Sequence, residues 1–278
     1  MKNLKVKSHA IKENVEYFKR FDYHIEEIKR NGFTIVPDLI DKNNLEHIKS
    51  KIYNIYDIQV NEVGGEENLN KIHDQGFVMS LLSYDNFFID YATGNGCIDL
   101  VKYFLGDYFQ LFCQNGVINQ NLRENDQIIN MWHRDLNYLH FTTSKPFGIN
   151  VFFCIDDFTN ENGATYMLPG SHRHEKFPGV EYAEKHKIQM EAKAGSALVF
   201  DAMIFHRAGR NISKKDRLTM TNIYTYPFMK QQIILNPNLE DFAKDDEEKM
   251  KILGFFNKTV DSVKKFRQIR IARSDKNE

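Results

Sequence analysis

Apolar side chains recur at helical spacing near the start of the chain. Between residues 11 and 30 they fall three or four positions apart, which predicts a helix that ends at Asn31-Gly32. Residues 33–36 form a short apolar run that a proline ends, as expected of a strand. Asp41 then precedes a second helical pattern. It can cap that helix, because an aspartate side chain accepts a hydrogen bond from a free N–H of the first turn.

This second predicted helix has one apolar face, made of Leu45, Ile48, Ile52 and Ile55. Residues 61–80 contain three glycines and show no apolar periodicity, so we expect a loop there. Residues 86–105 return to a helical pattern, with glycines interrupting it at 94 and 96. The first hundred residues are therefore expected to be mainly helical.

From about residue 108 the pattern changes to short runs rich in β-branched and aromatic side chains. Asn162-Gly163 separates two of these runs and predicts a hairpin, because both residues tolerate the positive φ of a tight turn. Many short strands separated by turns favour a sandwich or barrel. The predicted strands cover residues 108–118, 127–133, 147–155, 164–169, 197–201, 204–206 and 217–226.

The chain of 278 residues is expected to form one domain over residues 1–278. We divide it into a largely helical part at 1–106, a β core at 107–228 and a helical tail at 229–278. The predicted fold class is mainly β with flanking helices. Hydrophobic residues make up 42% of the chain, which is enough to build a sizeable core.

Charge and cysteine usage narrow the setting. The formal net charge is −1, so there is no electrostatic case for nucleic acid or for an anionic membrane as a partner. No apolar run reaches 18 residues, so no membrane span is expected. The three cysteines are far apart, and the charged first segment lacks the apolar stretch of a signal peptide. We therefore expect a cytoplasmic protein with reduced thiols; the sequence does not determine its oligomeric state.

The triplet His133-Arg134-Asp135 is the first candidate for chemistry. By itself it is a weak motif, because 10 histidines and 38 acids in 278 residues give about one such spacing by chance. His24 and Glu26 share the spacing but lie in a predicted helix, where residues i and i+2 point about 200° apart. His133 and Asp135 follow a strand-like run, and on a strand residues i and i+2 share a face.

Two later residues complete a possible site. His206 ends the strand-like run 198–206, and two imidazoles with one carboxylate are the ligand set of non-haem Fe(II) oxygenases, which leave positions for a co-substrate and O₂. Arg217 could hold a dicarboxylate such as 2-oxoglutarate, and Thr219 would share its strand face. The alternative interpretation of Arg217 is a surface residue beside other charges.

Three segments together resemble a known family. They are WHRD (132–135), KPFGINVFFCIDDFTNENGATYMLPGSHR (145–173) and AGSALVFDAMIFHRAGRNISKKDR (194–217). Their order and spacing resemble the phytanoyl-CoA dioxygenase family of Fe(II)/2-oxoglutarate-dependent oxygenases, over roughly residues 20–228. The resemblance implies a double-stranded β-helix, or jelly roll, that carries its metal ligands at one open end.

The resemblance also implies roles for residues. His133, Asp135 and His206 would ligate Fe(II), and Arg217 would bind the distal carboxylate of 2-oxoglutarate. Related halogenases have a small residue at the position of Asp135, so its carboxylate favours oxygen transfer over halogenation. The implied reaction consumes O₂ and 2-oxoglutarate, releases succinate and CO₂, and hydroxylates an aliphatic C–H bond of a small or carrier-linked metabolite.

Weaker candidates surround these residues. Gln120 and Asn130 could reach the co-substrate, although core-lining or turn roles would also explain them. Arg134 is predicted to face away from its two neighbours, in a structural ion pair or against substrate or co-substrate. His172 and His174 are predicted to be exposed turn residues, because no third metal ligand is nearby.

Several questions stay open at this point. His73 and Asp74 could face the substrate from the expected loop, and Arg123, Tyr138 and His140 are lid candidates. The roles of the segments 61–80 and 171–186 are not determined. The same iron site could desaturate, epimerise or cyclise its substrate. A metal-binding jelly roll without turnover is another possibility, while a zinc hydrolase is disfavoured because no HExxH-type general base is present. For the substrate, the sequence favours a small polar metabolite or biosynthetic intermediate.

Overall fold

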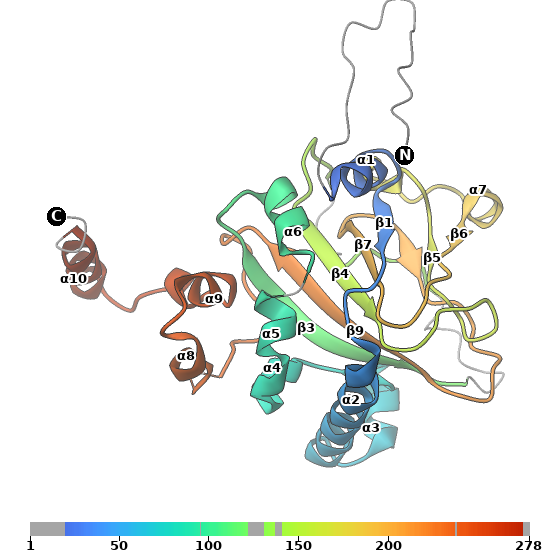
Figure 1. Ribbon diagram of the computed structural model, residues 1–278, viewed down its shortest axis with the longest axis horizontal. Helices are drawn as coiled ribbons and strands as arrows, with labels where there is room; N and C mark the ends of the chain where they lie inside the picture. The colour runs from blue at the N-terminus through green and yellow to red at the C-terminus, as the bar shows by residue number, and fades with distance from the viewer. Residues whose placement is uncertain (1–19, 95, 122–130, 137–140, 237, 275–278) are drawn as a thin grey trace, which may run out of the picture.

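The computed structural model describes residues 20–94, 96–121, 131–136, 141–236 and 238–274. Two antiparallel sheets form the centre of the molecule (Figure 1). The larger sheet has the strand order β1-β7-β4-β9-β3-β2, and the smaller has the order β6-β5-β8. This arrangement is the expected jelly roll. The strands are β1 Phe33–Val36, β2 Phe77–Val78, β3 Gln110–Asn119, β4 Gly148–Cys154, β5 Tyr166–Met167, β6 Ile188–Gln189, β7 Ala197–Asp201, β8 His206–Arg207 and β9 Arg217–Thr225.

Helices cover one face of the larger sheet, where α4, α5 and α6 lie across it (Figure 1). The predicted cap is confirmed: the Asp41 side chain accepts a hydrogen bond from the Asn43 N–H at 2.9 Å and begins α2. The α-helices are α1 Asp22–Asn31, α2 Lys42–Glu62, α3 Glu66–Ile72, α4 Leu81–Tyr84, α5 Ile89–Thr93, α6 Ile98–Leu105, α7 Val180–His186, α8 Asn238–Ala243, α9 Glu247–Ile252 and α10 Val263–Ser274. Short 3₁₀ turns lie at η1 Asn86–Phe88, η2 Ser171–Arg173 and η3 Phe255–Asn257.

Strand β4 shows how the larger sheet serves two environments. Ile149, Val151 and Phe153 point to the helix side and join the main apolar core. The residues between them, Asn150 and Phe152, point to the other face, where Phe152 packs on the apolar cluster between the two sheets. Because side chains alternate along a strand, each strand of this sheet contributes to the helix-covered core and to the jelly-roll interior.

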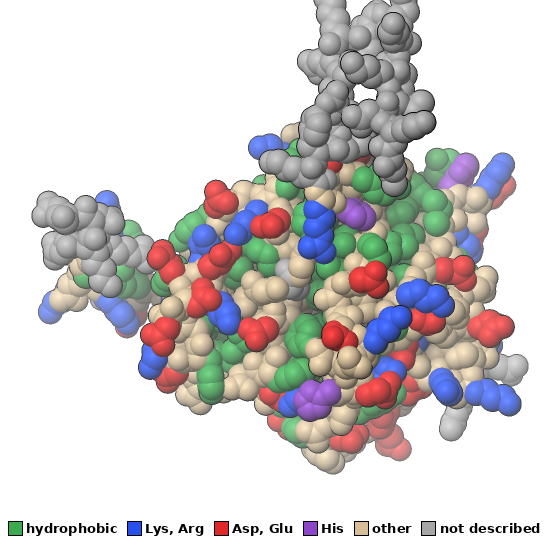
Figure 2. All heavy atoms as spheres, in the orientation of Figure 1, with side chains coloured by type: hydrophobic (Ala, Val, Ile, Leu, Met, Phe, Trp, Pro, Cys, Tyr) green, Lys and Arg blue, Asp and Glu red, His purple; other side chains and the backbone are tan. Residues whose placement is uncertain are grey.

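The outer surface carries mixed charge. Figure 2 shows lysine and arginine side chains interleaved with aspartates and glutamates on the face in view. Helix α10 projects from the body near the end of the chain, and its residues 263–272 are exposed (Figure 1). Among the helices of the described ranges, none combines the length and the hydropathy needed to cross a membrane.

The loop expected at residues 61–80 was wrong. Helix α2 continues to Glu62, α3 follows, and β2 pairs with β3. Glu66 and Glu67 at the start of α3 and Lys71 in its last turn complement the helix dipole. Only Leu69 of this short helix is buried, so the sequence has no apolar periodicity there from which a helix could be predicted.

One turn prediction needs correction. Gly163 does make a turn at φ 75°, but β4 and β5 on either side belong to different sheets, so no hairpin forms there. The strand predicted at 197–201 is confirmed as β7, and the run up to His206 is interrupted by a turn. Asp201 accepts the N–H of Met203 on its side chain and the N–H of Ile204 on its carbonyl, and this turn moves the chain from β7 to β8 in the other sheet.

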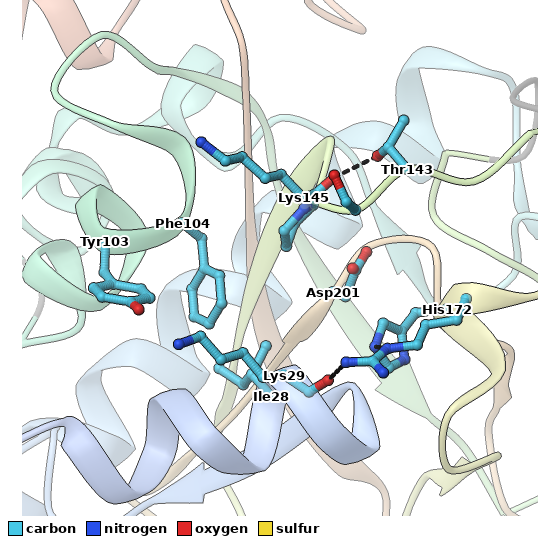
Figure 3. Close-up of a pocket in the computed structure, with 11 residues that line it drawn as sticks. Ile28, Lys29, Tyr103, Phe104, Thr143, Lys145, His172 and Asp201 are labelled. Atoms are coloured by element: carbon cyan, nitrogen blue, oxygen red, sulfur yellow. Dashed lines mark hydrogen bonds between the residues drawn. The ribbon is translucent and has the colours of Figure 1, made fainter. Parts of the chain in front are cut away.

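Asp201 lines a cavity of about 790 Å³ outside the larger sheet. Figure 3 shows it facing the same space as His172 and Lys145, with Tyr103 and Phe104 of α6 on another wall. The Asp201 side chain is buried, and this burial raises its pKa to about 7 against the opposing effects of the Met203 N–H and Arg134. Ionising Asp201 therefore costs folding free energy.

We expect Asp201→Asn to change the pH dependence of stability. The folded state holds the Asp201 proton more tightly than the unfolded chain, so stability is lost as pH rises from about 4 through 7. The asparagine keeps the acceptor for the Met203 N–H without the charge. Urea unfolding of the metal-free protein should show the variant more stable than the parent at pH 8, by at most about 4 kcal/mol, with little difference at pH 4.

Asp57→Asn, at an exposed position of α2, is the matched control and should shift neither value. An Asp201→Asn effect of equal size at both pH values would contradict a raised pKa at this carboxyl.

Candidate metal centre

Backbone pairing brings His133 and His206 together. Each donates its N–H to the carbonyl of the other at 3.0 Å, which forms an isolated antiparallel bridge. The pairing sets the two imidazole rings 4.3 Å apart between centroids. The neighbouring Asp135 N–H donates to the Ala202 carbonyl at 3.1 Å and fixes the third side chain. Two hydrogen bonds of the bridge and one beside it therefore build the group.

The three side chains can share one ion. A nitrogen from each histidine and a carboxylate oxygen of Asp135 all lie within 4.8 Å of one another. His206 of β8 is buried, Asp135 is partly buried and His133 is exposed. These three residues, which we call the metal group, therefore open toward solvent at His133. It is the only such cluster of three among the residues placed by the structure.

Backbone carbonyls orient the imidazole rings of His133 and His206. The Nδ1 of His133 lies 3.0 Å from the Met131 carbonyl, and the Nδ1 of His206 lies 3.1 Å from the Ile204 carbonyl. Because a carbonyl only accepts hydrogen bonds, each Nδ1 carries the proton and each Nε2 keeps a free lone pair. That is the tautomer a metal requires, held by an outer contact as in known histidine sites.

Asn150 of β4 holds the carboxylate. Its Nδ2 donates to Asp135 Oδ2 at 2.8 Å, while Asp135 Oδ1 lies 3.4 Å from His206 Nε2. Asn150 is itself fixed by Thr221 of β9, whose hydroxyl donates to the amide oxygen at 2.7 Å. One carboxylate oxygen is thus occupied by an amide, and the other is directed at the histidine pair.

Electrostatics keep the carboxylate charged. Burial would raise the pKa of Asp135, but His206 and His133 and the hydrogen bond from Asn150 together lower it. Burial would likewise lower the pKa of His206, but the adjacent Asp135 raises it. The pair therefore attracts positive charge at neutral pH, and a divalent cation between Asp135 and the His206 Nε2 would supply it.

Arg217 is buried and forms no ion pair with another described residue, although the charge of Asp156 acts on it. Its side chain is only 1% exposed, and no carboxylate of the described ranges lies within 4.0 Å of the guanidinium. Its Nη1 donates to Thr219 Oγ1 at 3.0 Å, its Nε donates to the Asn162 carbonyl at 3.3 Å, and the guanidinium stacks on Phe158 at 4.1 Å. Burial lowers its pKa to about 10. Such a charge is costly to bury unless an anion joins it.

Strand β9 connects this arginine to the metal group. Arg217, Thr219 and Thr221 occupy alternate positions, so they share the interior face, and Thr221 contacts the asparagine that holds Asp135. With about 7 Å for every two strand residues, the guanidinium stem begins on the order of 14 Å from Thr221. Arg217 and the asparagine contact of Asp135 therefore lie along one interior face.

The structural ion pair predicted for Arg134 is not found among the described residues. Arg134 faces away from the metal group as expected, but it forms no ion pair within 4.0 Å in the described part of the chain. Its Nε donates to the Met203 carbonyl at 2.7 Å, and its Nη1 donates to the Glu175 carbonyl at 3.0 Å; the Ser171 and His174 carbonyls also accept from it. The Arg134 guanidinium thus connects the segment 171–175 to the turn between β7 and β8.

The remaining candidates fall elsewhere or are not placed. Gln120 follows β3, is partly buried and makes no side-chain hydrogen bond to another described residue, so its role stays a prediction. Asn130, Arg123, Tyr138 and His140 lie outside the described residues. His73 is exposed at the end of α3, with Asp74 beside it.

The exposure predicted for His172 was wrong. Its ring is buried against Gly32, which leaves room because it has no side chain and adopts φ +92°. His174 is exposed as predicted. Trp132 packs near Phe177, 5.9 Å between ring centroids, and against the cluster of Leu168, Ala183 and Phe205.

Sequence analysis missed Asn150 and Thr221. Asn150 is a polar residue in an otherwise apolar strand, and that was the available signal. Thr221 lies in a strand where polar and apolar residues mix, so it did not stand out. Asn119 was missed in the same way: it is buried, pairs with Arg217 across the sheet, and donates to the carbonyl of Gly209 at 3.2 Å. It lies one residue before the proposed Gln120.

Curated proteins match most of this chain. The uncharacterized protein Rv1501 of Mycobacterium tuberculosis is 28% identical over 242 residues, which cover 85% of this chain and 88% of that protein. Dioxygenase af480 of Aspergillus fumigatus is 27% identical over 210 residues, covering 73% of this chain and 66% of that protein.

Solved structures share the fold. The epimerase SnoN, in a crystal structure with Fe³⁺, alpha ketoglutarate and nogalamycin RO, superposes with a TM-score of 0.58 at 16% identity, covering 74% of this chain and 84% of that chain. The Ni complex of the non-heme monooxygenase ThoJ gives a TM-score of 0.56 at 20% identity, covering 73% and 77%. Residues 28–219 match the sequence pattern of the phytanoyl-CoA dioxygenase (PhyH) family. The chain therefore belongs to the phytanoyl-CoA dioxygenase family of Fe(II)/2-oxoglutarate-dependent enzymes.

Proposed function

We propose that this chain is an Fe(II)- and 2-oxoglutarate-dependent dioxygenase that hydroxylates an aliphatic C–H bond of a small or carrier-linked molecule. His133, Asp135 and His206 hold the metal, and Arg217 with Thr219 holds the distal carboxylate of 2-oxoglutarate. The observation that carries the proposal is Arg217, which is buried on the interior face of β9 and forms no ion pair with another described residue. A dicarboxylate bound there would supply such a pair.

The donor set fits Fe(II). Two neutral imidazole nitrogens and one carboxylate oxygen converge, as in the facial arrangement that leaves open positions for co-substrate and O₂. When bound, the iron supplies the activation of O₂ that the protein's own side chains cannot. Asp135 is present where a halide site would need a small residue, which favours oxygen transfer over halogenation.

The chain's own residues contribute orientation and charge. Asn150 fixes which Asp135 oxygen faces the ion, and the Met131 and Ile204 carbonyls fix the two rings. Arg217 aligns the co-substrate by a two-point contact that a lysine could not give. Phe158 and Phe200 line the interior beside Arg217 and His206, and they exclude water from the space between.

Epimerisation or desaturation would use the same residues, and a structural neighbour is an epimerase. A metal-binding module without turnover has no need for a buried arginine that lacks a counter-ion, so we favour an enzyme. The discriminating experiment is Fe(II)-dependent release of succinate from 2-oxoglutarate without added substrate. No succinate from the iron-loaded protein would favour the binding module.

We expect His206→Ala to abolish Fe(II) binding and succinate release, because the variant loses one of two nitrogen ligands. Circular dichroism should remain that of the parent, since backbone pairing with His133 does not need the ring. His174→Ala removes an exposed histidine of η2's flank and serves as the control. Zn²⁺ and Ni²⁺ should bind the parent and inhibit it. Full activity of His206→Ala would refute the ligand assignment.

We expect Asn150→Ala to weaken Fe(II) affinity by roughly 10- to 100-fold, because outer contacts of a metal ligand have effects of that size. Thr221→Val removes only the support of Asn150 and should cause a smaller loss in the same direction. Equilibrium metal titration measures both. Parent-like affinity in Asn150→Ala would show that Asp135 keeps its orientation without the amide.

We expect Arg217→Met to weaken 2-oxoglutarate binding by roughly 10- to 150-fold, equivalent to about 1.5–3 kcal/mol for a charge-assisted contact. Methionine fills similar space without charge. Arg217→Lys should recover only part of the affinity. The measurement is anaerobic titration of the Fe(II) protein with 2-oxoglutarate, followed by the visible charge-transfer band.

Arg210→Ala, at an exposed position nearby, should leave this titration unchanged. Metal affinity should stay at the parent value in all three arginine variants. Tight 2-oxoglutarate binding by Arg217→Met would place the carboxylate clamp elsewhere.

A further inference from the structure

An apolar cluster adjoins the metal group on the side away from Arg217. Its buried members are Leu136, Ala202, Met203 and Ile223. Leu136 follows Asp135 in the chain, and the Ala202 carbonyl accepts the Asp135 N–H at 3.1 Å. The cluster therefore touches the same backbone that positions the carboxylate.

Strand register fixes this placement. Ile223 of β9 pairs with Asn150 of β4 on one side and with Cys113 of β3 on the other, so the three share the interior face. Asn150 holds Asp135, which places Ile223 beside the metal group. Arg217 lies six residues earlier on the same face. The interior face of β9 thus carries Arg217 and two threonines on one side of Asp135, and Ile223 followed by the buried Thr225 on the other.

The thiol of Cys113 supports this proximity. Burial raises its pKa, and the charge of Asp135 raises it further, which keeps the thiol neutral. Cys113 packs against the apolar cluster together with Phe112 and Met229.

Aromatic rings extend the cluster to solvent. Phe147 packs on it, and the rings of Phe141 and Phe228 approach Phe147 edge-on at 5.3 and 6.4 Å between centroids. Tyr226 stacks on Phe228 with an angle of 6° between the rings. Phe141 is 47% exposed and Phe228 is 72% exposed. Exposed rings that continue an apolar cluster at an active centre are typical of a ligand contact surface.

We infer that this aromatic surface, made of Phe112, Phe141, Phe147 and Phe228 over the buried Ile223, binds the substrate and selects one with a flat, uncharged, aromatic or polycyclic face. The inference rests on the proposed function, since it places the substrate beside the proposed iron. It replaces the small polar metabolite favoured by the sequence. Flat rings gain both apolar burial and edge or stacking contacts with such side chains.

The experiment uses indole as an uncharged aromatic probe and 1-octanol as a linear apolar probe of equal carbon number. Each is titrated anaerobically into the parent protein loaded with Fe(II) and 2-oxoglutarate. Indole should shift the visible charge-transfer band with saturation, because a ligand beside the iron changes its surroundings, whereas 1-octanol should not.

Phe147→Ala and Phe228→Ser should each raise the indole concentration for half of the shift by about 10-fold, the loss expected when one aromatic contact of about 1.4 kcal/mol is removed. Phe242→Ser changes an exposed ring of α8 and should leave the indole response at the parent value. Two independent variants guard against a misfolded one, and each shift is compared with its own band before indole is added.

Failure of the two proposals can be told apart. If the band never forms in the parent, the proposed iron and 2-oxoglutarate site is wrong. If the band forms but indole leaves it unchanged, or 1-octanol shifts it equally, the aromatic selectivity is wrong. An unchanged indole titration in both phenylalanine variants would equally overturn this surface as the binding site.

Discussion

The two-residue alternation of the larger sheet is the constraint on which the rest of this structure depends. In β9, Leu218, Met220 and Tyr224 face the helices and complete the main core. The residues between them face the interior, where they supply the arginine, the threonines and the apolar end of the site. A slip of one residue would place the guanidinium in the apolar core and empty the site. Folding and site assembly are therefore one event.

The interior itself is electrostatically incomplete. Asp135 attracts positive charge that His206 only partly supplies, and the buried Arg217 forms no ion pair with another residue that the structure describes. Unpaired buried charge opposes folding, so the surrounding apolar clusters must stabilise the chain against it. A metal at one end and a dicarboxylate at the other would relieve both, and each ligand would stabilise the fold by binding only the folded state.

The turn between β7 and β8 contacts three parts of the molecule. Its Ala202 carbonyl holds the Asp135 backbone, its Met203 carbonyl accepts from Arg134, and its Asp201 side chain forms part of the outer cavity (Figure 3). Arg134 in turn holds the carbonyls of segment 171–175. Hydrogen bonds of Arg134 therefore join this segment and the cavity wall to the chain between His133 and Asp135, although neither contributes a candidate ligand.

The sequence by itself determined the local elements and the chemistry-bearing residue types. Periodicity located α2, the cap at Asp41 and the strands β3, β4, β7 and β9, because these signals depend on neighbours in the chain. Spacing and resemblance selected His133, Asp135, His206 and Arg217.

Tertiary structure alone decided which strands share a sheet, so the hairpin at Asn162-Gly163 was mispredicted. It also decided that Asn150 holds Asp135, that Arg134 binds carbonyls and that an aromatic surface adjoins the site. These contacts join residues far apart in sequence, and their pairing follows from sheet register, which no local pattern encodes.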